Sequence, residues 1–252
     1  MTGMFDWFGK RAKSEDDAID ASRQALLIDP KDVKVWYSLG VAYDDLDRHD
    51  DAIAAYRQVV RINPEAADAW YSLGLAYAAL DRHDDAIAAY RQVVRLHPEF
   101  VTAWNNLGKA YAALDRHDDA IEAFRQATRL HPEAADAWYN RGVTYSELKC
   151  DDDAIVAYRQ ALRVNPEFAA AWNNLGKAYA KLDRYNDAIA AYRQVVRINP
   201  EAADAWYLLG VASVLSGNRT AALDAVWELR RLDPRKADSL FNLIVPHWRN
   251  RG

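Results

Sequence analysis

The sequence predicts an all-α solenoid built from antiparallel helix pairs that stack at a regular interval. Seven prolines recur at one constant interval, at Pro30, Pro64, Pro98, Pro132, Pro166, Pro200 and Pro234. A tryptophan follows each of the first six prolines at a fixed distance, at Trp36, Trp70, Trp104, Trp138, Trp172 and Trp206. A period of this length is typical of repeats that are single supersecondary units and bury their apolar faces against their neighbours.

Two apolar stripes divide each repeat into a pair of helices. The first stripe has the i, i+3, i+4, i+7 spacing of one helical face, as in Trp70, Leu73, Gly74 and Tyr77. The second stripe, which ends before the next proline, contains Ala86, Ile87, Tyr90, Val93 and Val94. We expect a short turn between the two helices, with carboxylates at the start of the second helix, where the helix dipole favours negative charge.

A glycine recurs in the middle of each first helix, where glycine is less favourable than alanine by about 1 kcal/mol. These glycines are Gly40, Gly74, Gly108, Gly142, Gly176 and Gly210. An alanine recurs in step in each second helix, at Ala52, Ala86, Ala120, Ala154, Ala188 and Ala222. We expect these small residues to face one another and to let the two helices of a pair approach closely.

Composition and charge narrow the classes of partner. The chain has 252 residues, of which 51% are hydrophobic, and a net charge of −5, which argues against general affinity for nucleic acid or anionic membranes. It has no apolar run of the roughly 18 to 20 residues that a membrane span needs, and its N-terminus lacks the pattern of a secretory signal. The single cysteine, Cys150, cannot form an internal disulfide. We therefore expect a cytoplasmic protein.

The residues that could carry chemistry do not form a catalytic or metal-binding pattern. His49, His83 and His117 occupy equivalent positions in successive repeats, too far apart to share one zinc ion. The aspartate-rich turns lack the ligand order of a calcium loop, and no phosphate-binding loop or nucleophile elbow is present. Cys150 beside Lys149 is either a tolerated turn substitution or a reactive thiol. The sequence predicts no enzyme, no cofactor and no metal site.

These motifs resemble those of the tetratricopeptide repeat family, whose 34-residue pattern of Trp, Leu, Gly, Tyr, Ala, aromatic and Pro they match at nearly every position. The resemblance implies a right-handed superhelical solenoid of antiparallel helix pairs. It divides the chain into an N-terminal aromatic segment or short capping helix (1–13), a half repeat (14–32), six repeats (33–66, 67–100, 101–134, 135–168, 169–202 and 203–236) and a C-terminal capping helix and tail (237–252).

The last repeat departs from the pattern. Ser213 replaces its tyrosine, and Val226 replaces the aromatic residue of its second helix. We expect a final helix over roughly residues 236–245 to cover the last open face, because terminal repeats need a cap, and we expect Pro246 to stop it.

In the family that the chain resembles, the first helices line a concave groove for a bound peptide. Transferred position by position, the predicted groove residues are Tyr37, Tyr71, Asn105, Asn106, Lys109, Tyr139, Asn140, Asn173, Asn174, Lys177 and Tyr207. Asn106, Asn140 and Asn174 resemble an asparagine ladder that holds peptide backbone, since an amide both donates to a carbonyl and accepts from an N–H. The bound segment would carry apolar or aromatic side chains, with acceptors near the lysines. The alternative is that these residues are ordinary choices on a solvated helix face.

A second candidate surface is formed by paired arginines on the second helices. They are Arg57 and Arg61, Arg91 and Arg95, Arg125 and Arg129, Arg159 and Arg163, and Arg193 and Arg197. A glutamate lies four residues after the second arginine of each pair, at Glu65, Glu99, Glu133, Glu167 and Glu201. The arginines either form structural salt links with these neighbours or dock an acidic protein.

The N-terminal run Met4-Phe5-Asp6-Trp7-Phe8 is either a cap for the half repeat or an anchor for the groove of another molecule. The resemblance favours a non-catalytic scaffold or adaptor that binds an extended peptide of a partner protein. The alternatives are a self-assembling structural module, and the recognition part of a larger enzyme system.

Overall fold

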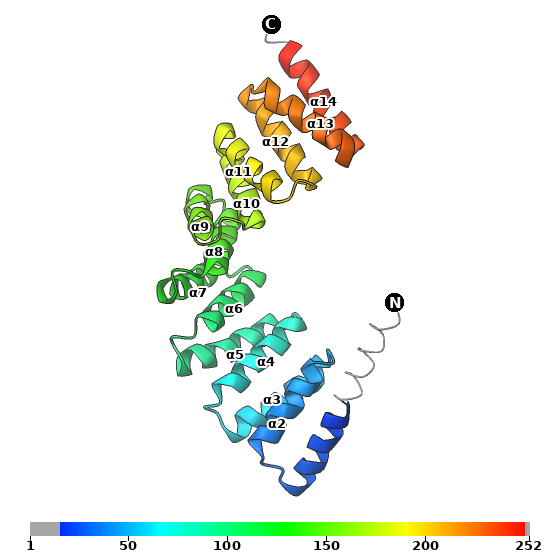
Figure 1. Cartoon of the computed structure of the whole chain (residues 1–252). Helices are drawn as coiled ribbons and strands as arrows, with labels where there is room; N and C mark the ends of the chain where they lie inside the picture. Colours follow the sequence, from blue (N-terminus) through cyan, green and yellow to red (C-terminus); the bar gives the residue numbers. More distant parts are fainter. Residues whose placement is uncertain (1–15, 250–252) are drawn as a thin grey trace. The chain divides into compact units, whose positions relative to one another are not determined.

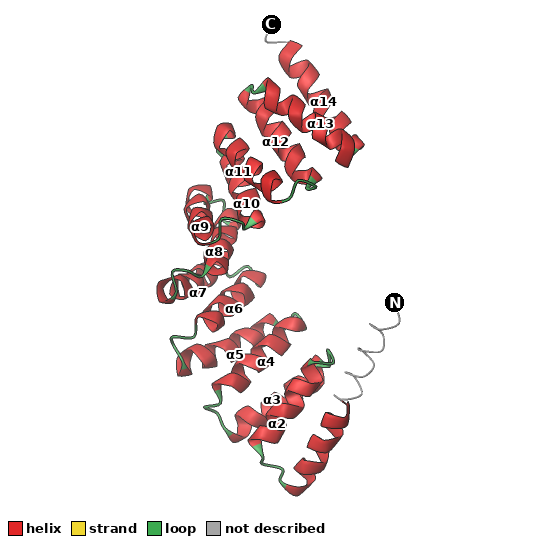
Figure 2. Cartoon of the chain, in the orientation of Figure 1, coloured by secondary structure: helices red, strands yellow, loops and turns green. Residues whose placement is uncertain are grey.

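The computed structural model describes residues 16–249, and every regular element in this range is a helix (Figures 1 and 2). The aromatic segment at residues 1–13 lies outside the described residues. Contacts between α-carbons divide the chain into two compact units, Met1–Leu130 and His131–Gly252, which are described one after the other.

The first unit begins, within its described part, with a helix over residues 16–28. The bounds of the following helices are Val33–Asp44 (α2), His49–Ile62 (α3), Ala67–Ala79 (α4), His83–Leu96 (α5), Val101–Ala113 (α6) and His117–Leu130 (α7). Each helix contacts the next along the chain, so α2 with α3, α4 with α5 and α6 with α7 form the expected pairs. Their apolar faces share one core, in which Tyr56 and Tyr90 are fully buried.

The second unit continues the same order of helices. Their bounds are Ala135–Glu147 (α8), Asp151–Val164 (α9), Ala169–Lys181 (α10), Tyr185–Ile198 (α11), Ala203–Ser216 (α12), Arg219–Leu232 (α13) and Pro234–Arg249 (α14). The final helix α14 packs on both helices of the preceding pair, α12 and α13.

Helix α14 begins earlier and ends later than the sequence predicts. Only Asp233 separates it from α13, and the Asp233 side chain accepts the backbone N–H groups of Arg235 and Lys236 at 3.1 and 3.2 Å. This cap, with Pro234 at the first helical position, starts the helix directly after α13. The expectation that Pro246 stops the helix is wrong, because α14 continues to Arg249.

The fixed interval between proline and tryptophan has a direct structural cause. In each of the six repeats the indole N–H of the tryptophan donates to the carbonyl of the preceding recurrent proline, over 2.8 to 3.0 Å. The proline lies in the turn that precedes each first helix, where its carbonyl has no partner within the helix. The indole therefore satisfies a backbone acceptor while its ring packs against the core.

The recurrent glycines face aromatic rings, so the expectation that alanines face them is wrong. A Cβ built on Gly74 would lie 2.5 Å from a ring carbon of Tyr90, on the second helix of the same pair. The same contact recurs as Gly40 with Tyr56, Gly108 with Phe124, Gly142 with Tyr158, and Gly176 with Tyr192. The recurrent alanines are fully buried, but the aromatic rings supply the atoms nearest to each glycine.

The last pair has no aromatic residue at this position and fills the space from α14. The side chain of Leu240 is fully buried and lies nearest to Gly210, followed by the methyl group of Ala225. Leu240 thus replaces the ring that Val226 is too small to provide. The C-terminal helix thus contributes to the core of the last repeat.

The turns inside the pairs contain one residue in the left-handed region. These residues are Asp47, Asp81, Asp115, Lys149 and Asp183, with φ between 54° and 60°, and Gly217, with φ of 79°. The predicted carboxylates at the start of the second helices are confirmed, as in Asp84 and Asp85 of α5. Asp85 also holds Arg82 of the turn, whose Nη2 lies 2.7 Å from its carboxylate.

Candidate functional site

Tyrosine and asparagine side chains of neighbouring first helices bond to each other in both units. In the first unit Asn106 Nδ2 of α6 donates to the hydroxyl of Tyr71 of α4 over 3.1 Å. In the second unit Asn174 Nδ2 of α10 donates to the hydroxyl of Tyr139 of α8 over 3.2 Å. We call these pairs the Tyr71–Asn106 rung and the Tyr139–Asn174 rung. The structure thus brings four of the predicted groove residues together in two hydrogen-bonded pairs.

The tyrosine rings of the two rungs pack against other aromatic rings of the same unit. The Tyr71 ring lies 5.0 Å from that of Phe100 and 6.0 Å from that of Tyr90, measured between centroids. The Tyr139 ring has equivalent neighbours in Phe168, at 4.8 Å, and Tyr158, at 6.0 Å. This packing fixes the position of each hydroxyl and therefore of the amide bonded to it.

Burial lowers the acidity of two tyrosine hydroxyl groups at the rungs. It raises the pKa of Tyr71, against the smaller opposing effect of the bond from Asn106. Burial likewise raises the pKa of Tyr158 behind the second rung to about 12. Tyr71 and Tyr158 therefore remain uncharged at physiological pH and contribute hydrogen-bonding groups rather than charge.

Two cavities lie along the first helices, one in each unit. In the first unit a cavity of about 380 Å³ is lined by residues of α2 and α4, with Tyr37, Ser38 and Asp68 among them. In the second unit a smaller cavity of about 200 Å³ lies beside the second rung and is lined by Asn174 and Lys177. The rungs and these cavities together form the candidate site of each unit.

Sequence reasoning missed three polar residues of these sites. The hydroxyl oxygens of Tyr37 and Ser72 lie 3.3 Å apart, in the arrangement that the rungs use, with serine in place of asparagine. Ser146 and Lys181 line the smaller cavity, and Lys181 Nζ also forms an ion pair with Asp151 at 3.0 Å. Ser72 could have been found from its position, because it stands one repeat before Asn106.

The remaining predicted groove residues lie on first helices as expected. Half-buried Asn105 and exposed Lys109 belong to α6 in the first unit. In the second unit half-buried residues are found on α8, α10 and α12, namely Asn140, Asn173 and Tyr207. The predicted asparagine ladder is therefore divided between the units, with Asn106 in the first and both Asn140 and Asn174 in the second.

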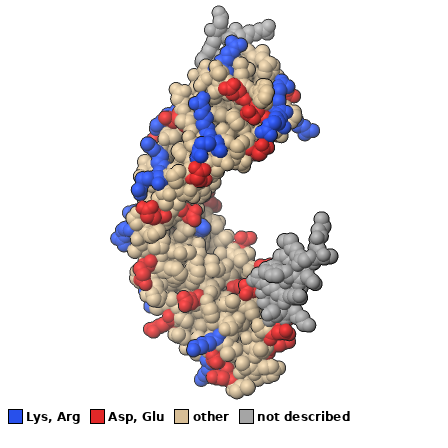
Figure 3. All heavy atoms as spheres, in the orientation of Figure 1, with Lys and Arg blue, Asp and Glu red and all other residues tan. Residues whose placement is uncertain are grey.

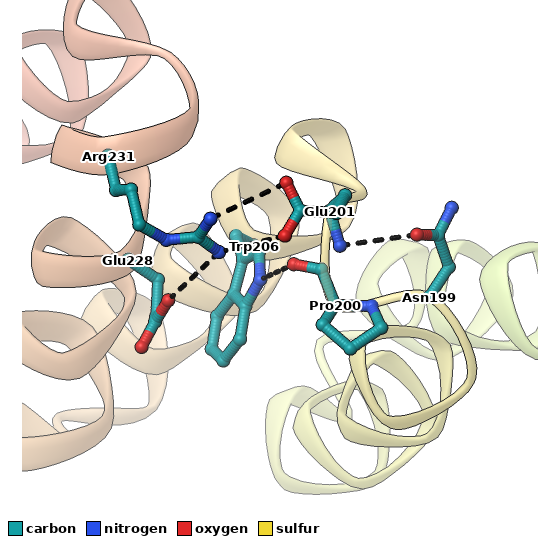
Figure 4. A network of polar contacts seen from close by, with 6 residues as sticks. All are labelled: Asn199, Pro200, Glu201, Trp206, Glu228 and Arg231. Carbon is teal, nitrogen blue, oxygen red and sulfur yellow. Dashed lines mark hydrogen bonds and ion pairs between the residues drawn. The ribbon is translucent and has the colours of Figure 1, made fainter.

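One second arginine of the predicted pairs, Arg197, forms an ion pair with the preceding repeat, whereas Arg95 and Arg163 donate to glutamines of their own helices. Arg197 pairs with Glu167 at 2.7 Å, and the equivalent Arg231 pairs with Glu201 at 3.0 Å (Figure 4). The glutamate four residues later was the wrong partner for Arg197, because α11 ends at Ile198 and the chain turns away at Pro200. These ion pairs link neighbouring repeats.

Two of the first arginines in the first unit bind tyrosines of the following repeat, whereas Arg125 pairs with Glu122 of its own helix. Arg57 Nε donates to the hydroxyl of Tyr77 over 2.7 Å, and Arg91 Nε donates to that of Tyr111 over the same distance. Basic and acidic side chains lie interspersed over the face of the molecule drawn in Figure 3. Part of the arginine surface is therefore used for contacts within the solenoid.

The histidines and the cysteine that the sequence offered as metal ligands or a reactive thiol lie in or beside the turns of the helix pairs. Within residues 16–249 no group of three or more His, Cys, Asp or Glu side chains is placed to hold a metal ion. His49 Nδ1 lies 3.0 Å from the Asp44 carboxylate. Cys150 is exposed in a turn, and its Sγ lies 3.7 Å from the carbonyl oxygen of Leu148. None of the helices in the described part of the chain combines the length and apolarity needed to cross a membrane.

Comparison with known families identifies the repeats. Models of the tetratricopeptide repeat match residues 16–67, 37–99, 71–127 and 105–149, and a second model with the same description matches 135–168 and 169–201. The chain therefore belongs to the tetratricopeptide repeat family. Proteins of this family are generally non-catalytic scaffolds that bind protein or peptide partners.

Solved structures with similar folds agree with this assignment. A crystal structure of MamA is 27% identical, has a TM-score of 0.63, and is aligned over 66% of this chain and 97% of its own. A crystal structure of YrrB, described as a TPR protein with an unusual peptide-binding site, is 22% identical to this chain and has a TM-score of 0.64. The alignment covers 75% of this chain and 99% of the YrrB chain.

The C-terminal part of a TPR repeat-containing protein from Cytophaga hutchinsonii is 16% identical, with a TM-score of 0.78, over 93% of this chain and 97% of its own. At such low identities, the similarity to this protein and to YrrB shows the fold alone. No curated protein matches the sequence.

Proposed function

We propose that this protein is a scaffold or adaptor that binds an extended peptide segment of a partner protein along its first helices. The observation that carries the proposal is the recurrence of one polar arrangement, the Tyr–Asn rung, at equivalent positions in both units. In both rungs the asparagine follows its tyrosine by 35 residues, so each unit presents the same pair of polar groups on its first helices.

The chemistry of a rung suits the backbone of a peptide. An asparagine amide has two N–H groups and one oxygen; Asn106 uses one N–H for the Tyr71 hydroxyl, and Asn174 bonds to the hydroxyls of Tyr139 and Tyr158. The amide oxygens, and at Asn106 also the second N–H, can bond to an N–H and a carbonyl of a bound chain. Because the tyrosine already orients the amide, less side-chain freedom is lost when the peptide binds.

The spacing of the repeats also suits an extended chain. Packed helices lie about 8–10 Å apart, and a strand advances about 3.3 Å per residue, so successive repeats would meet roughly every third residue. The residues between these contacts could place side chains in the neighbouring cavities. Lys177, exposed at the cavity of the second unit, favours a carboxylate or another acceptor there.

The test compares proteins captured from the source organism by the wild-type chain and by a variant with Asn106→Ala and Asn174→Ala. The matched control carries Asn186→Ala and Asn242→Ala, which change two exposed asparagines outside the rungs. We expect the control to capture the same proteins as the wild type and the rung variant to lose them. Circular dichroism should show all three chains equally folded.

A synthetic peptide from a protein that is lost should bind the wild type with at least about tenfold higher affinity than the rung variant, equivalent to about 1.4 kcal/mol. Identical sets of proteins for all three chains would contradict the proposal. Recovery of this chain alone would favour self-assembly instead.

A further inference from the structure

Equivalent cavities recur on the second-helix side of both units. In the second unit a cavity of about 380 Å³ is enclosed by α9, α10 and α11. In the first unit a cavity of about 480 Å³ lies at the same place in the repeat, and each of its lining residues precedes its counterpart by four repeats. We call them the Arg159 pocket and the Arg23 pocket.

The two pockets differ in residue type at one position alone. Arg163 lines the Arg159 pocket where Leu27 lines the Arg23 pocket. They also differ in how the shared arginine is used, since Arg23 Nη2 donates to the hydroxyl of Tyr43 over 2.8 Å. None of the hydrogen bonds and ion pairs within residues 16–249 involves Arg159, although Tyr179 stands where Tyr43 stands in the other pocket.

The positive charge of the Arg159 pocket is not neutralised from within. Its carboxylate, Asp187, is held by Arg184 of the adjacent turn, with Oδ2 2.8 Å from Arg184 Nη2. Arg163 donates to the neutral side chain of Gln160 over 3.1 Å. This differs from the equivalent Arg231, which two glutamates flank (Figure 4). Two guanidinium groups therefore face the cavity without a carboxylate partner of their own.

Apart from Tyr179 and Gln194, the remaining walls of the pocket are formed by apolar residues and the Trp172 ring. Its base consists of three buried residues, Leu162, Leu175 and Ala191, of which 6%, 3% and 2% of the surface is exposed. Because these side chains are packed in the core, the base of the pocket is rigid. Trp172 contributes its ring, because its N–H is already donated to the carbonyl of Pro166 over 2.8 Å. A ligand for this pocket combines an apolar group with negative charge.

We propose that the Arg159 pocket binds an acidic peptide segment, with an aliphatic side chain between the leucines and carboxylates on Arg159 and Arg163. An exposed guanidinium with a flat arrangement of donors is suited to bind carboxylates in pairs of hydrogen bonds. A nucleic acid fits less well, because the chain has a net charge of −5 and the floor of the pocket is apolar. The two arginines lie on the second helix α9, and none of the residues that line the pocket belongs to a rung.

The test uses a short fluorescein-labelled peptide of alternating glutamate and leucine, with a peptide of alternating glutamine and leucine as its control. We expect the acidic peptide alone to bind the full chain, with an affinity that falls as salt is raised. Arg159→Gln with Arg163→Gln should lower this affinity by at least about tenfold, since both substitutions remove charge-assisted hydrogen bonds to the carboxylates. Lys31→Gln with Arg61→Gln removes the same charge from the first unit and should leave binding unchanged.

A second pair of variants separates the pocket from the overall charge. Ala190→Trp fills the Arg159 pocket without changing its charge, and Ala54→Trp does the same in the Arg23 pocket; both alanines are exposed. We expect Ala190→Trp to abolish binding and Ala54→Trp to preserve it. Absence of binding to the wild type, equal binding of both peptides, or tighter binding of inorganic polyphosphate that survives Ala190→Trp would each overturn the proposal.

Discussion

Replacing Gly74 with alanine is expected to lower the free energy of unfolding by about 1–3 kcal/mol, the usual effect of overpacking a core. Helix propensity alone predicts the opposite, a gain of about 1 kcal/mol. The added methyl group would lie 2.5 Å from the Tyr90 ring, which is fully buried and cannot move without disturbing the core of the first unit. Urea unfolding of the wild type and the variant measures the difference.

A double-mutant cycle shows whether the aromatic ring is the cause. Tyr90→Val removes the ring and leaves the residue type that Val226 provides in the last repeat. If the ring excludes the methyl group, Gly74→Ala should be less destabilising in the Tyr90→Val background than in the wild type. Strictly additive effects would show that the glycine is required for another reason.

Replacing Leu240 with alanine is expected to lower the free energy of unfolding by about 2–5 kcal/mol. The Leu240 side chain is fully buried and fills the space beside Gly210 that an aromatic ring fills in the earlier repeats. Its loss would leave a cavity among α12, α13 and α14. Hydrogen exchange should show faster opening of these three helices than of the rest of the second unit.

The matched control for this prediction is Leu243→Ala on the same helix. Leu243 has 46% of its surface exposed, so its truncation should change the stability by much less. Equal effects of the two substitutions would contradict the role of Leu240 as the residue that completes the last repeat.

The helix pairs could be predicted because their signals are local. The interval between proline and tryptophan and the apolar stripes of the helices all act within one repeat. The contact of Gly74 with Tyr90 could not be read from the sequence, because it depends on how two helices turn toward each other. The pairing of Arg197 with Glu167 of the preceding repeat likewise depends on the stacking of repeats. Helix α14 starts earlier than predicted because a single residue links it to α13, and the regular spacing of the prolines did not indicate so short a linker.

The candidate site could be predicted one residue at a time but not as an arrangement. Asn106 and Tyr71 were both expected in the groove from their positions in the repeat. Their bond, between neighbouring repeats, emerged only from the structure. The Arg159 pocket was harder to predict, because the same pair of arginines recurs in five repeats and only the structure shows which of them have partners.

The most direct test of peptide binding along the first helices is site-specific photo-crosslinking. A benzophenone amino acid placed at Leu75, which is 42% exposed on α4, is compared with one at Leu223, which is 40% exposed on the second helix α13. The proposal predicts that position 75 crosslinks to one continuous segment of a partner protein and that position 223 does not. Crosslinks to the partner from position 223 alone would contradict it.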